Sequence, residues 1–560
     1  MSEQTSCAKI VVQSLINAGV KHIFGIPGAK IDSIFDELLN HPDVNLVVCR
    51  HEQNAGFIAG AIGRITGKPG VCLVTSGPGA TNLVTALATA NTESDPIVAI
   101  AGSVARPQAT KRTHQSLKAT DVLRPVVKNA IEINHEDDVA EVFCNAFREA
   151  ESNPKGAVFV SIPMDIGPLH SKVLAFPPES YVAPEYGIAN SKSIKSCISM
   201  LESAKNPVLF LGLRSSDPDT VSCVHSFLQK HPMPVVETFQ GAGCLNRELV
   251  HLFYGRVGLF RNQPGDKLLA KSDLVITVGY DPIEYDAVQW TKDTKFKLIH
   301  LDSIRCDFDQ FYKPTVELLG SIPDTLDAIK NGTNKVSSFD PEFLQKLRQE
   351  IISIQTPSKS IQDSLKDKIH PLHFIKVLRS LISDDTTVAV DIGSVYIYMA
   401  RYFYAYQSRS LLFSNGQQTL GVALPWAIGA SLCQDVPCSK KVISVSGDGG
   451  FLFSGQELAT AVEQKCNITH FIWNDHSYNM VSFQEIYKYG RDSGVKLGHV
   501  DFVKYAESFG AKGLRINETS ELMSVMKEAV EYEGVVVVDI NIDYSNNSNL
   551  GKNIIPGDLD

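Results

Sequence analysis

Two aspartates at the ends of predicted strands are the strongest chemical signal in this sequence. Asp448 lies in a Gly-Asp-Gly-Gly run that follows the mostly apolar residues 442–445, and Asp475 lies in an Asn-Asp pair that follows residues 471–473. Magnesium takes oxygen ligands and commonly bridges one or two carboxylates to phosphate oxygens. Glycines let the backbone approach a phosphate with its N–H groups. The pattern predicts a site for a diphosphate and a divalent cation.

The spacing of the two aspartates fits one strand–helix–strand crossover, which takes roughly 30 residues. A helix is expected between them, over residues 456–464. Both acids then lie at the edge where open α/β sheets bind ligands. A Gly-Asp-Gly triplet alone is also a common turn, so two unrelated strand-end turns are the alternative at this point.

Composition sets the class of protein and excludes several partners. The chain has 560 residues, of which 44% are apolar and 20% are charged, as in an ordinary globular protein of about three domains. The net charge is −10 without a basic run, which argues against nucleic acid. No window holds 18 uninterrupted apolar residues, so we expect no membrane span. The N-terminus is polar and leads into a surface helix rather than a signal peptide.

Eleven cysteines are scattered without a Cys-x-x-Cys pair. An odd number in a long chain fits reduced thiols in the cytoplasm.

The elements that must position these groups alternate between strands and helices. Strands are expected over residues 21–26, 45–49, 70–75 and 96–100, with helices over 29–40, 53–66 and 80–90. This alternation predicts a parallel sheet covered on both faces. The fold class is therefore α/β, with three doubly wound parallel-sheet domains. Their expected ranges are 1–170, 190–335 and 365–545, with linkers at 174–184 and 331–370 and a C-terminal tail at 546–560 that is either disordered or a flap over a site.

Three further groups in the first domain could take part in binding or catalysis. Glu52 opens a helix after a strand, where a glutamate is also ordinarily stabilised by the helix dipole. Residues 24–30 and 75–82 are glycine-bearing strand-to-helix turns that permit close backbone approach. Lys30 beside the first turn is either a solvated lysine or a contact for a small carboxylate.

Taken together, these motifs resemble the thiamine-diphosphate-dependent enzymes, in which Gly-Asp-Gly is followed one crossover later by Asn-Asn. Here the last asparagine is Asp475, a swap that preserves oxygen ligation. Over essentially the whole chain the sequence resembles the acetolactate synthase family, most of all its catabolic, flavin-independent form. The matching segments are residues 24–32, 51–55, 76–82, 114–116, 414–419, 421–426 and 478–481.

The resemblance implies a pyrimidine-binding domain, a central Rossmann-like domain and a diphosphate-binding domain. It assigns the magnesium ligands to Asp448, Asp475 and the Ser477 carbonyl. Glu52 is then the carboxylate that hydrogen-bonds N1′ of the aminopyrimidine, and Gln115 and Lys30 complete the catalytic set. The expected cofactor-binding residues are Pro27, Gly28, Pro78, Asn82, Ser394, Gln418, Leu420, Gly449, Gly450, Tyr478, Asn479 and Met480.

The implied reaction is a carboligation. The cofactor ylid adds to pyruvate, carbon dioxide leaves, and the hydroxyethyl-thiamine diphosphate enamine attacks a second pyruvate to give 2-acetolactate. The active site is expected between subunits, which makes a homodimer the minimum and a homotetramer the expected assembly. Pyruvate decarboxylase and FAD-dependent pyruvate oxidase are the alternatives, and a non-catalytic cofactor-binding homologue is a remote one.

Two departures from the family pattern bear on specificity. Biosynthetic members carry a tryptophan that favours 2-oxobutyrate as acceptor, whereas Gln484 stands here. We therefore expect pyruvate as donor and acceptor, with acetoin and butanediol formation favoured over branched-chain amino acids as the destination. The residue that supports the bent cofactor is usually methionine, and Leu420 keeps nearly the same volume. The central domain lacks a tight Gly-x-Gly-x-x-Gly turn, so FAD is not expected.

Overall fold

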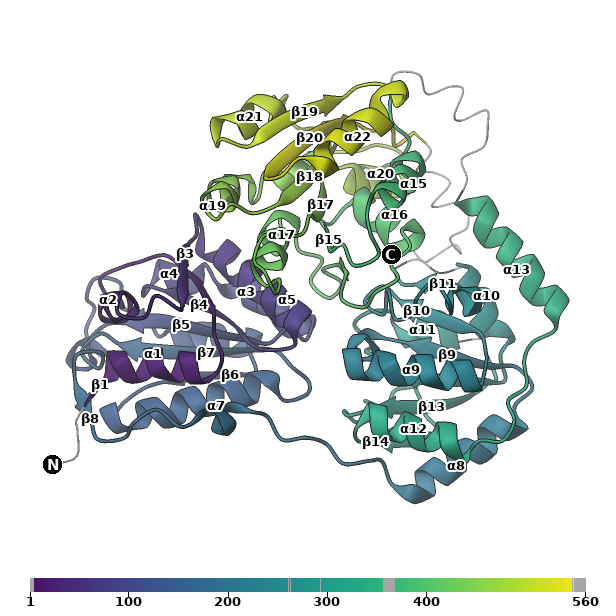
Figure 1. Ribbon diagram of the computed structural model, residues 1–560, viewed down its shortest axis with the longest axis horizontal. Helices are drawn as coiled ribbons and strands as arrows, with labels where there is room; N and C mark the ends of the chain where they lie inside the picture. Colours follow the sequence, from purple (N-terminus) through teal and green to yellow (C-terminus); the bar gives the residue numbers. More distant parts are fainter. Residues whose placement is uncertain are drawn as a thin grey trace.

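The computed structural model describes residues 5–259, 261, 263–292, 294–355, 368–545 and 547. Within them the chain forms three units, each built on one six-stranded sheet whose strand pairs are all parallel. The first unit runs from purple to blue in Figure 1, the central unit is teal, and the third is green to yellow. Helices cover both faces of the sheets, so the predicted α/β class of three doubly wound parallel sheets is confirmed.

The first unit has the strand order β3-β2-β4-β5-β7-β6. Its strands are β2 (His22–Gly25), β3 (Asn45–Val48), β4 (Gly70–Val74), β5 (Ile97–Ser103), β6 (Asn129–Glu132) and β7 (Ala157–Pro163). Its helices are α1 (Cys7–Asn17), α2 (Asp32–Leu38), α3 (Glu52–Thr66), α4 (Pro78–Thr81), α5 (Val84–Thr92), α6 (Ala119–Leu123) and α7 (Val139–Glu151). A short antiparallel pair, β1 (Thr5–Ser6) with β8 (His170–Ser171), closes the unit.

The third unit repeats that arrangement, with the order β16-β15-β17-β18-β20-β19. Its strands are β15 (Val388–Val390), β16 (Leu411–Leu412), β17 (Val442–Gly447), β18 (Ile468–Asn474), β19 (Lys512–Ile516) and β20 (Val535–Asn541). Its helices are α15 (Pro371–Leu381), α16 (Ser394–Tyr402), α17 (Ala423–Leu432), α18 (Asp448–Phe451), α19 (Leu458–Glu463), α20 (Asn479–Tyr489), α21 (Phe502–Ser508) and α22 (Leu522–Glu531). Counted in chain order, the first and third units place their strands identically.

The central unit has the different order β11-β10-β9-β12-β13-β14, which is that of a dinucleotide-binding fold. Its strands are β9 (Pro207–Leu211), β10 (Val235–Thr238), β11 (Phe253–Val257), β12 (Leu274–Val278), β13 (Lys297–Asp302) and β14 (Val316–Leu319). Its helices are α8 (Ser191–Ser203), α9 (Pro218–Lys230), α10 (Pro264–Lys271), α11 (Ala287–Thr291), α12 (Ile322–Gly332) and α13 (Pro341–Ile354).

The strands form where apolar runs are long enough to be buried on both faces. Strands β4, β5, β9 and β12 are buried along their whole length, as expected for parallel sheets sandwiched between helices. Two expected helices are divided in the structure. The helix over residues 80–90 becomes α4 and α5, and the one over 456–464 becomes the 3₁₀ turn η7 (Gly455–Glu457) followed by α19. No helix in the described ranges is long and apolar enough to cross a membrane.

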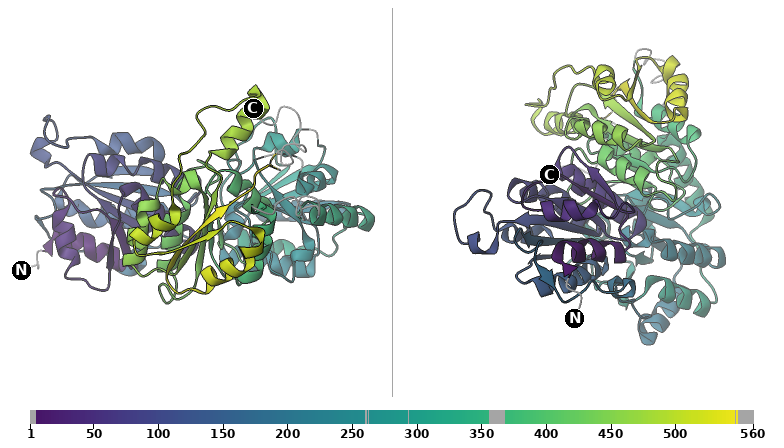
Figure 2. Two further views of the ribbon diagram at one scale, coloured as in Figure 1. Left: turned by 90° about the horizontal axis from the view of Figure 1, so that it is seen from above. Right: turned by 60° about the vertical axis from the view of Figure 1, so that its left-hand side comes forward.

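The third unit packs on the first through two helices, α3 and α17, whose apolar side chains share one hydrophobic core. The approach is close: a Cβ on Gly429 of α17 would lie 2.7 Å from the carbonyl oxygen of Ile58 on α3. Figure 2 shows the third unit lying across both of the others. Within one chain, the first and third units therefore pack directly against each other through a shared hydrophobic core.

Candidate active site

A cavity of about 300 Å³ lies at the carboxyl edge of the third sheet. It opens where the strand order reverses, between β15 and β17, which is where open α/β sheets bind ligands. Leu259 of the central unit closes one side. Every site residue predicted for the third domain lines this cavity: Ser394, Gln418, Leu420, Asp448, Gly449, Gly450, Asp475, Ser477, Tyr478, Asn479, Met480 and Gln484.

The two predicted acids meet in this cavity. Asp448 begins α18 directly after β17, and Asp475 follows β18. Burial and the neighbouring Asp475 carboxylate raise the pKa of Asp448 to about 7. Burial likewise raises the pKa of Asp475 to about 6. Two desolvated carboxylates are costly unless a cation lies beside them.

The surroundings of these acids fit a divalent cation held by oxygen atoms. Ser477 is buried next to them and its Oγ has no hydrogen-bond partner. The described residues contain no cluster of three His, Cys, Asp or Glu side chains suited to a metal. The predicted set of two carboxylates and one carbonyl is instead the kind that magnesium completes with phosphate oxygens.

A polar frame holds Asp475 in place. The Asn479 Nδ2 donates to Asp475 Oδ2 at 2.7 Å, and Asn479 Oδ1 accepts from Ser394 Oγ at 2.8 Å. Asn547 Nδ2 donates to both Asn479 Oδ1 and Ser394 Oγ, at 2.6 and 3.1 Å. Asn547 belongs to the tail at 546–560, of which residue 546 and residues 548–560 lie outside the described residues. At Asn547 at least, the tail lies against the site.

Two glycines make room in the cavity wall. A Cβ on Gly449 would lie 2.5 Å from the ring of Tyr478, and one on Gly450 would lie 2.7 Å from Asp391 Oδ1. Asp391 in turn accepts hydrogen bonds from the backbone N–H groups of Gly421 and Ala423. Any larger residue at 449 or 450 displaces groups that shape the cavity, so the glycine spacing is a steric requirement.

The predicted residues of the first unit form a separate group. Glu52 is the first residue of α3, after β3, and its Oε2 accepts from Asn82 Nδ2 at 2.9 Å. A Cβ on Gly79 would lie 3.7 Å from Glu52 Oε1, so the carboxylate lies over the turn after β4. Gln115 reaches the same turn, where Ser76 Oγ donates to its Oε1 at 3.2 Å.

The turn after β2 borders this group. A Cβ on Gly28 would lie 2.6 Å from the side chain of Thr75, so the turns after β2 and β4 touch. Pro27 and Pro78 are exposed at these turns. Lys30 is half-buried, and its backbone passes within contact of Gly102 at the end of β5. Lys30 forms no ion pair with any residue that the structure describes.

None of the first-unit residues lines the cavity of the third unit. The structure therefore brings the predicted site together as two half-sites within one chain. Three non-glycine residues with positive φ lie in or beside them: Gln115 at 59°, Gln418 at 48° and His476 at 57°. Such strained conformations concentrate at functional sites.

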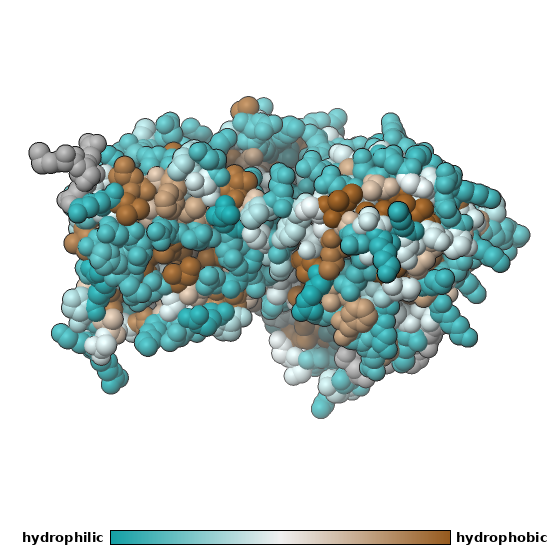
Figure 3. Space-filling model, turned by 90° about the horizontal axis from the view of Figure 1, so that it is seen from below, coloured by the Kyte–Doolittle hydropathy of each residue, from teal (hydrophilic) through white to brown (hydrophobic). Residues whose placement is uncertain are grey.

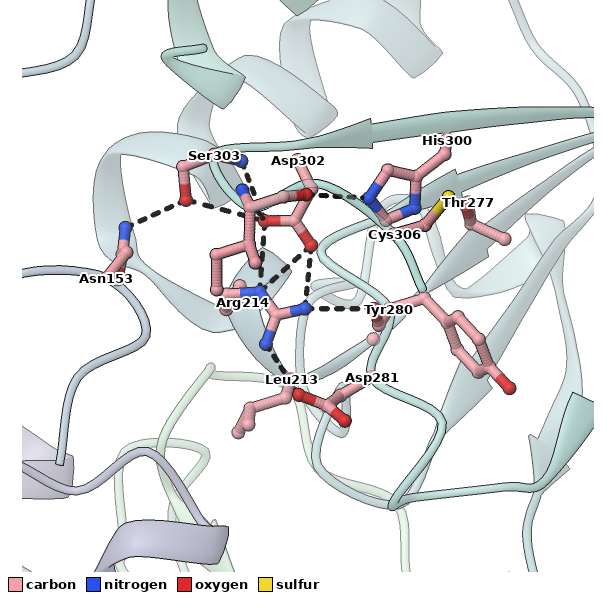
Figure 4. A network of polar contacts seen from close by, with 12 residues as sticks. Asn153, Leu213, Arg214, Thr277, Tyr280, Asp281, His300, Asp302, Ser303 and Cys306 are labelled. Carbon is pink, nitrogen blue, oxygen red and sulfur yellow. Dashed lines mark hydrogen bonds and ion pairs between the residues drawn. The ribbon is translucent and has the colours of Figure 1, made fainter. Parts of the chain in front are cut away.

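At the reversal between β9 and β12 in the central unit, an arginine is held by two carboxylates (Figure 4). Arg214 follows β9 and donates from Nε and Nη2 to the Asp302 carboxylate at the end of β13. Its Nη1 donates to Asp281 Oδ2 at 2.8 Å. Asn153 of the first unit donates to Ser303 beside this network, at 2.9 Å.

A second cavity, of about 640 Å³, lies between the first and central units next to this network. Basic and acidic side chains of both units line it. Figure 3 shows the underside of the two lobes, where hydrophilic residues surround several hydrophobic patches.

Several residues at the half-sites carry no signal in the sequence. Tyr544 and Leu259 line the cavity from distant segments, Asn547 bonds to the lining residue Ser394, and Asp391 lies against Gly450 in the cavity wall. Buried Glu457 contacts the start of α3. These residues reach the half-sites only through contacts with segments that are distant in the sequence. A search for local motifs therefore does not find them.

Comparison with known families agrees with this geometry. Residues 5–122 match the thiamine pyrophosphate enzyme N-terminal TPP binding domain, residues 194–329 match the central domain, and residues 391–540 match the C-terminal TPP binding domain. The chain is 47% identical to the acetolactate synthase of Bacillus subtilis, over 98% of this chain and 95% of that protein. The chain belongs to the acetolactate synthase family of thiamine pyrophosphate enzymes.

Other members of the family extend the likeness. The chain is 43% identical to a catabolic acetolactate synthase of Raoultella terrigena, over 96% of this chain and 95% of that protein. It is 31% identical to a probable acetolactate synthase large subunit of Methanococcus aeolicus, over 96% and 92%. Thiamine pyrophosphate is thiamine diphosphate, so the family's cofactor is the diphosphate that the third-unit cavity was predicted to hold.

Proposed function

We propose that this chain is an acetolactate synthase of the catabolic, FAD-independent kind. It condenses two pyruvate molecules into 2-acetolactate and carbon dioxide, with thiamine diphosphate and Mg²⁺. The observation that carries the proposal is the cavity in which buried Asp448 and half-buried Asp475 meet Gly449 and Gly450. Near-full-length identity to synthases of two bacteria supports it.

When bound, thiamine diphosphate supplies the nucleophilic carbon and the electron sink. The residues of the chain bind and orient the cofactor and the metal ion. Asp448, Asp475 and the Ser477 carbonyl hold Mg²⁺ against the diphosphate. Residues Ser394, Gln418, Gly449, Gly450, Tyr478, Asn479 and Met480 hold the diphosphate half, Pro27, Gly28, Pro78 and Asn82 border the pyrimidine half, and Leu420 supports the bend between them.

The remaining proposed roles concern protons and substrate. With the cofactor bound, Glu52 would exchange a proton with N1′ of the aminopyrimidine, and Asn82 orients the Glu52 carboxylate for that role. Gln115 would donate a hydrogen bond to an oxygen of the reacting substrate. Lys30, free of ion pairs in the described part of the chain, binds the carboxylate of pyruvate. Gln484 borders the acceptor position.

The same proposal requires more than one subunit. Glu52 and the aspartates belong to different half-sites of one chain, and a complete centre needs both. Apolar residues stay exposed around the cavity, among them Leu452, Phe453, Val481, Ile486 and Tyr487. A homodimer that joins the first unit of one chain to the third unit of its partner covers them, and two such dimers form the proposed homotetramer.

Flavin independence rests on the central unit. Arg214, paired with Asp302 and Asp281, lies at the strand reversal where a fold of this strand order binds a dinucleotide. The eleven scattered cysteines fit a reducing cytoplasm. Gln484 favours pyruvate as acceptor, and with it the acetoin and butanediol route.

Proton NMR of the products tests the proposal. The purified protein is given pyruvate, thiamine diphosphate and Mg²⁺ without FAD, and acetolactate is expected as the main product. Acetaldehyde as the main product would make it a decarboxylase. Turnover that begins only when FAD is added would favour an oxidase or a biosynthetic synthase. In a second experiment, 2-oxobutyrate is added at the same concentration as pyruvate, and acetolactate is expected to remain the main product.

A further inference from the structure

Glu457 is a buried carboxylate that joins the third unit to the first. It ends the 3₁₀ turn η7, on the connection that leads from α18 to α19, and its side chain is fully buried. Its Oε1 accepts from the backbone N–H of Arg50 at 2.9 Å and from Thr460 Oγ1 at 2.6 Å. Its Oε2 accepts from Asn54 Nδ2 at 2.7 Å. Both oxygens are thus in use, one of them by the backbone of another unit.

The two partners of Glu457 in the first unit bracket Glu52. Arg50 precedes His51, the N-cap residue of α3, and Asn54 lies in the first turn of that helix. Asn54 is buried, and its Oδ1 has no hydrogen-bond partner. The Asn54 amide is therefore oriented by its donation to Glu457 alone. Glu52 itself is half-buried and contacts the protein through Asn82.

We propose that Glu457 is a positioning residue for Glu52: by holding the backbone before it and the side chain after it, Glu457 sets the direction in which the Glu52 carboxylate points. This inference rests on the role proposed for Glu52 above. It also links two centres of the proposed dimer. Glu457 follows helix α18, whose Asp448 serves one centre, and it contacts the residues on either side of Glu52, which serves the other.

The first experiment replaces the carboxylate by a side chain of similar size in the full-length protein. In Glu457→Leu we expect kcat for pyruvate at saturating thiamine diphosphate and Mg²⁺ to fall at least tenfold, while KM for pyruvate changes less than threefold. Hydrogen exchange of the Arg50 amide, measured without cofactor, is expected to accelerate at least tenfold. An unchanged kcat in this variant would overturn the proposal.

Asp273→Leu provides a matched control in the central unit. Asp273 also accepts two backbone N–H groups across a long sequence separation, from Lys205 and Asn206, at 2.7 and 2.8 Å. Its loss is expected to lower the thermal midpoint but to leave kcat and the exchange of the Arg50 amide unchanged. If Asp273→Leu lowers kcat as much as Glu457→Leu, the effect is general destabilisation and the proposal fails.

Rescue separates geometry from charge. In Glu457→Gln the new amide faces Asn54, whose carboxamide can turn so that its free Oδ1 accepts; we expect kcat within threefold of wild type. Asn54→Asp places two carboxylates together and is expected to lose kcat, while the double variant Asn54→Asp with Glu457→Gln regains it. A Gln variant as inactive as Leu would overturn the proposal. If the wild-type protein forms no acetolactate, the proposed function fails. Hydrogen exchange of the Arg50 amide would still show whether Glu457 binds that amide.

Discussion

At the scale of single residues, the site uses carboxylates in two different environments. Burial, together with the neighbouring Asp475 carboxylate, raises the pKa of Asp448, and burial raises the pKa of Asp475. Glu52 is only half-buried and is paired with a neutral amide, that of Asn82. The first environment suits an ion, and the second suits a proton that must come and go.

Replacing Glu52 by glutamine tests the proton role at nearly constant shape. Because the amide cannot exchange a proton at N1′, we expect kcat to fall by about 10²–10⁴-fold. The thermal midpoint of the protein without cofactor should stay within a degree or two of wild type, as for a surface change. Pyruvate consumption and a thermal melt measure the two. The matched control is Glu37→Gln on α2, which should retain full activity; wild-type kcat in Glu52→Gln would remove Glu52 from its role.

At the scale of elements, the short helix α18 shows how a local sequence requirement shapes a cavity. Its first turn carries Asp448, Gly449 and Gly450, and the glycines lie where Tyr478 and Asp391 leave no room for a Cβ. These glycines bring the backbone at the start of α18 to the wall of the cavity proposed for the diphosphate.

Gly449→Ala is therefore expected to weaken cofactor binding. Overpacking of this kind costs about 1–3 kcal/mol, which corresponds to a rise of about 5- to 150-fold in the Kd for thiamine diphosphate if the cost falls on the bound state. Quenching of tryptophan fluorescence reports binding, because Trp473 lines the cavity. Gly187→Ala is the control, since nothing lies within 4 Å of a Cβ there. An unchanged Kd in Gly449→Ala would show that the cavity wall accommodates the extra methyl group without a loss of binding free energy, which would contradict the prediction.

Strand β18 contains a buried histidine that stays neutral in the folded protein. His470 is completely buried, its ring nitrogens lie 2.7 and 2.9 Å from Ser444 Oγ and Ser446 Oγ, and burial lowers its pKa to about 3. The unfolded chain takes up this proton below about pH 6.5 while the folded chain does not. The stabilisation is thus complete above pH 6.5 and is lost as the pH falls from there toward 3.

From pH 6.5 to 5 this histidine should cost the folded state roughly 2 kcal/mol. We expect His470→Gln, which cannot be protonated, to show a smaller drop in thermal midpoint between pH 7.5 and 5 than wild type. The exposed His251→Gln serves as control and should keep the wild-type dependence. Equal slopes in all three proteins would contradict the assignment.

The sequence predicts those features that follow from parallel-strand geometry. Asp448, Asp475, Glu52 and the turn glycines could be placed because strand ends of a parallel sheet share one edge. Asn547, Glu457 and Arg214 could not. Each owes its position to buried contacts with segments far away in the chain, and residue type alone leaves an asparagine, a glutamate or an arginine on the surface.

At the scale of the whole molecule, the first and third units share one strand order and place their candidate residues at the same reversal of the sheet. Packed through α3 and α17, they expose their half-sites separately within one chain. This arrangement explains why a single chain contains every predicted residue and yet does not assemble them in one cavity.

Hybrid dimers test this division. Neither Glu52→Gln nor Asp448→Asn should be active alone. A heterodimer purified through two different tags has one centre with both residues intact, so we expect roughly half of the wild-type activity per dimer. Mixing two separately purified, non-exchanging homodimers is the control and should give none. A silent heterodimer would indicate that each centre is built from one chain.

The ion pairs of Arg214 with Asp302 and Asp281 in the central unit bear on which vitamins the protein requires. Under the proposed flavin independence, the chain would need thiamine and would not need riboflavin. In a cell starved of riboflavin, carbon could therefore still leave pyruvate through this chain while flavin-dependent routes slow.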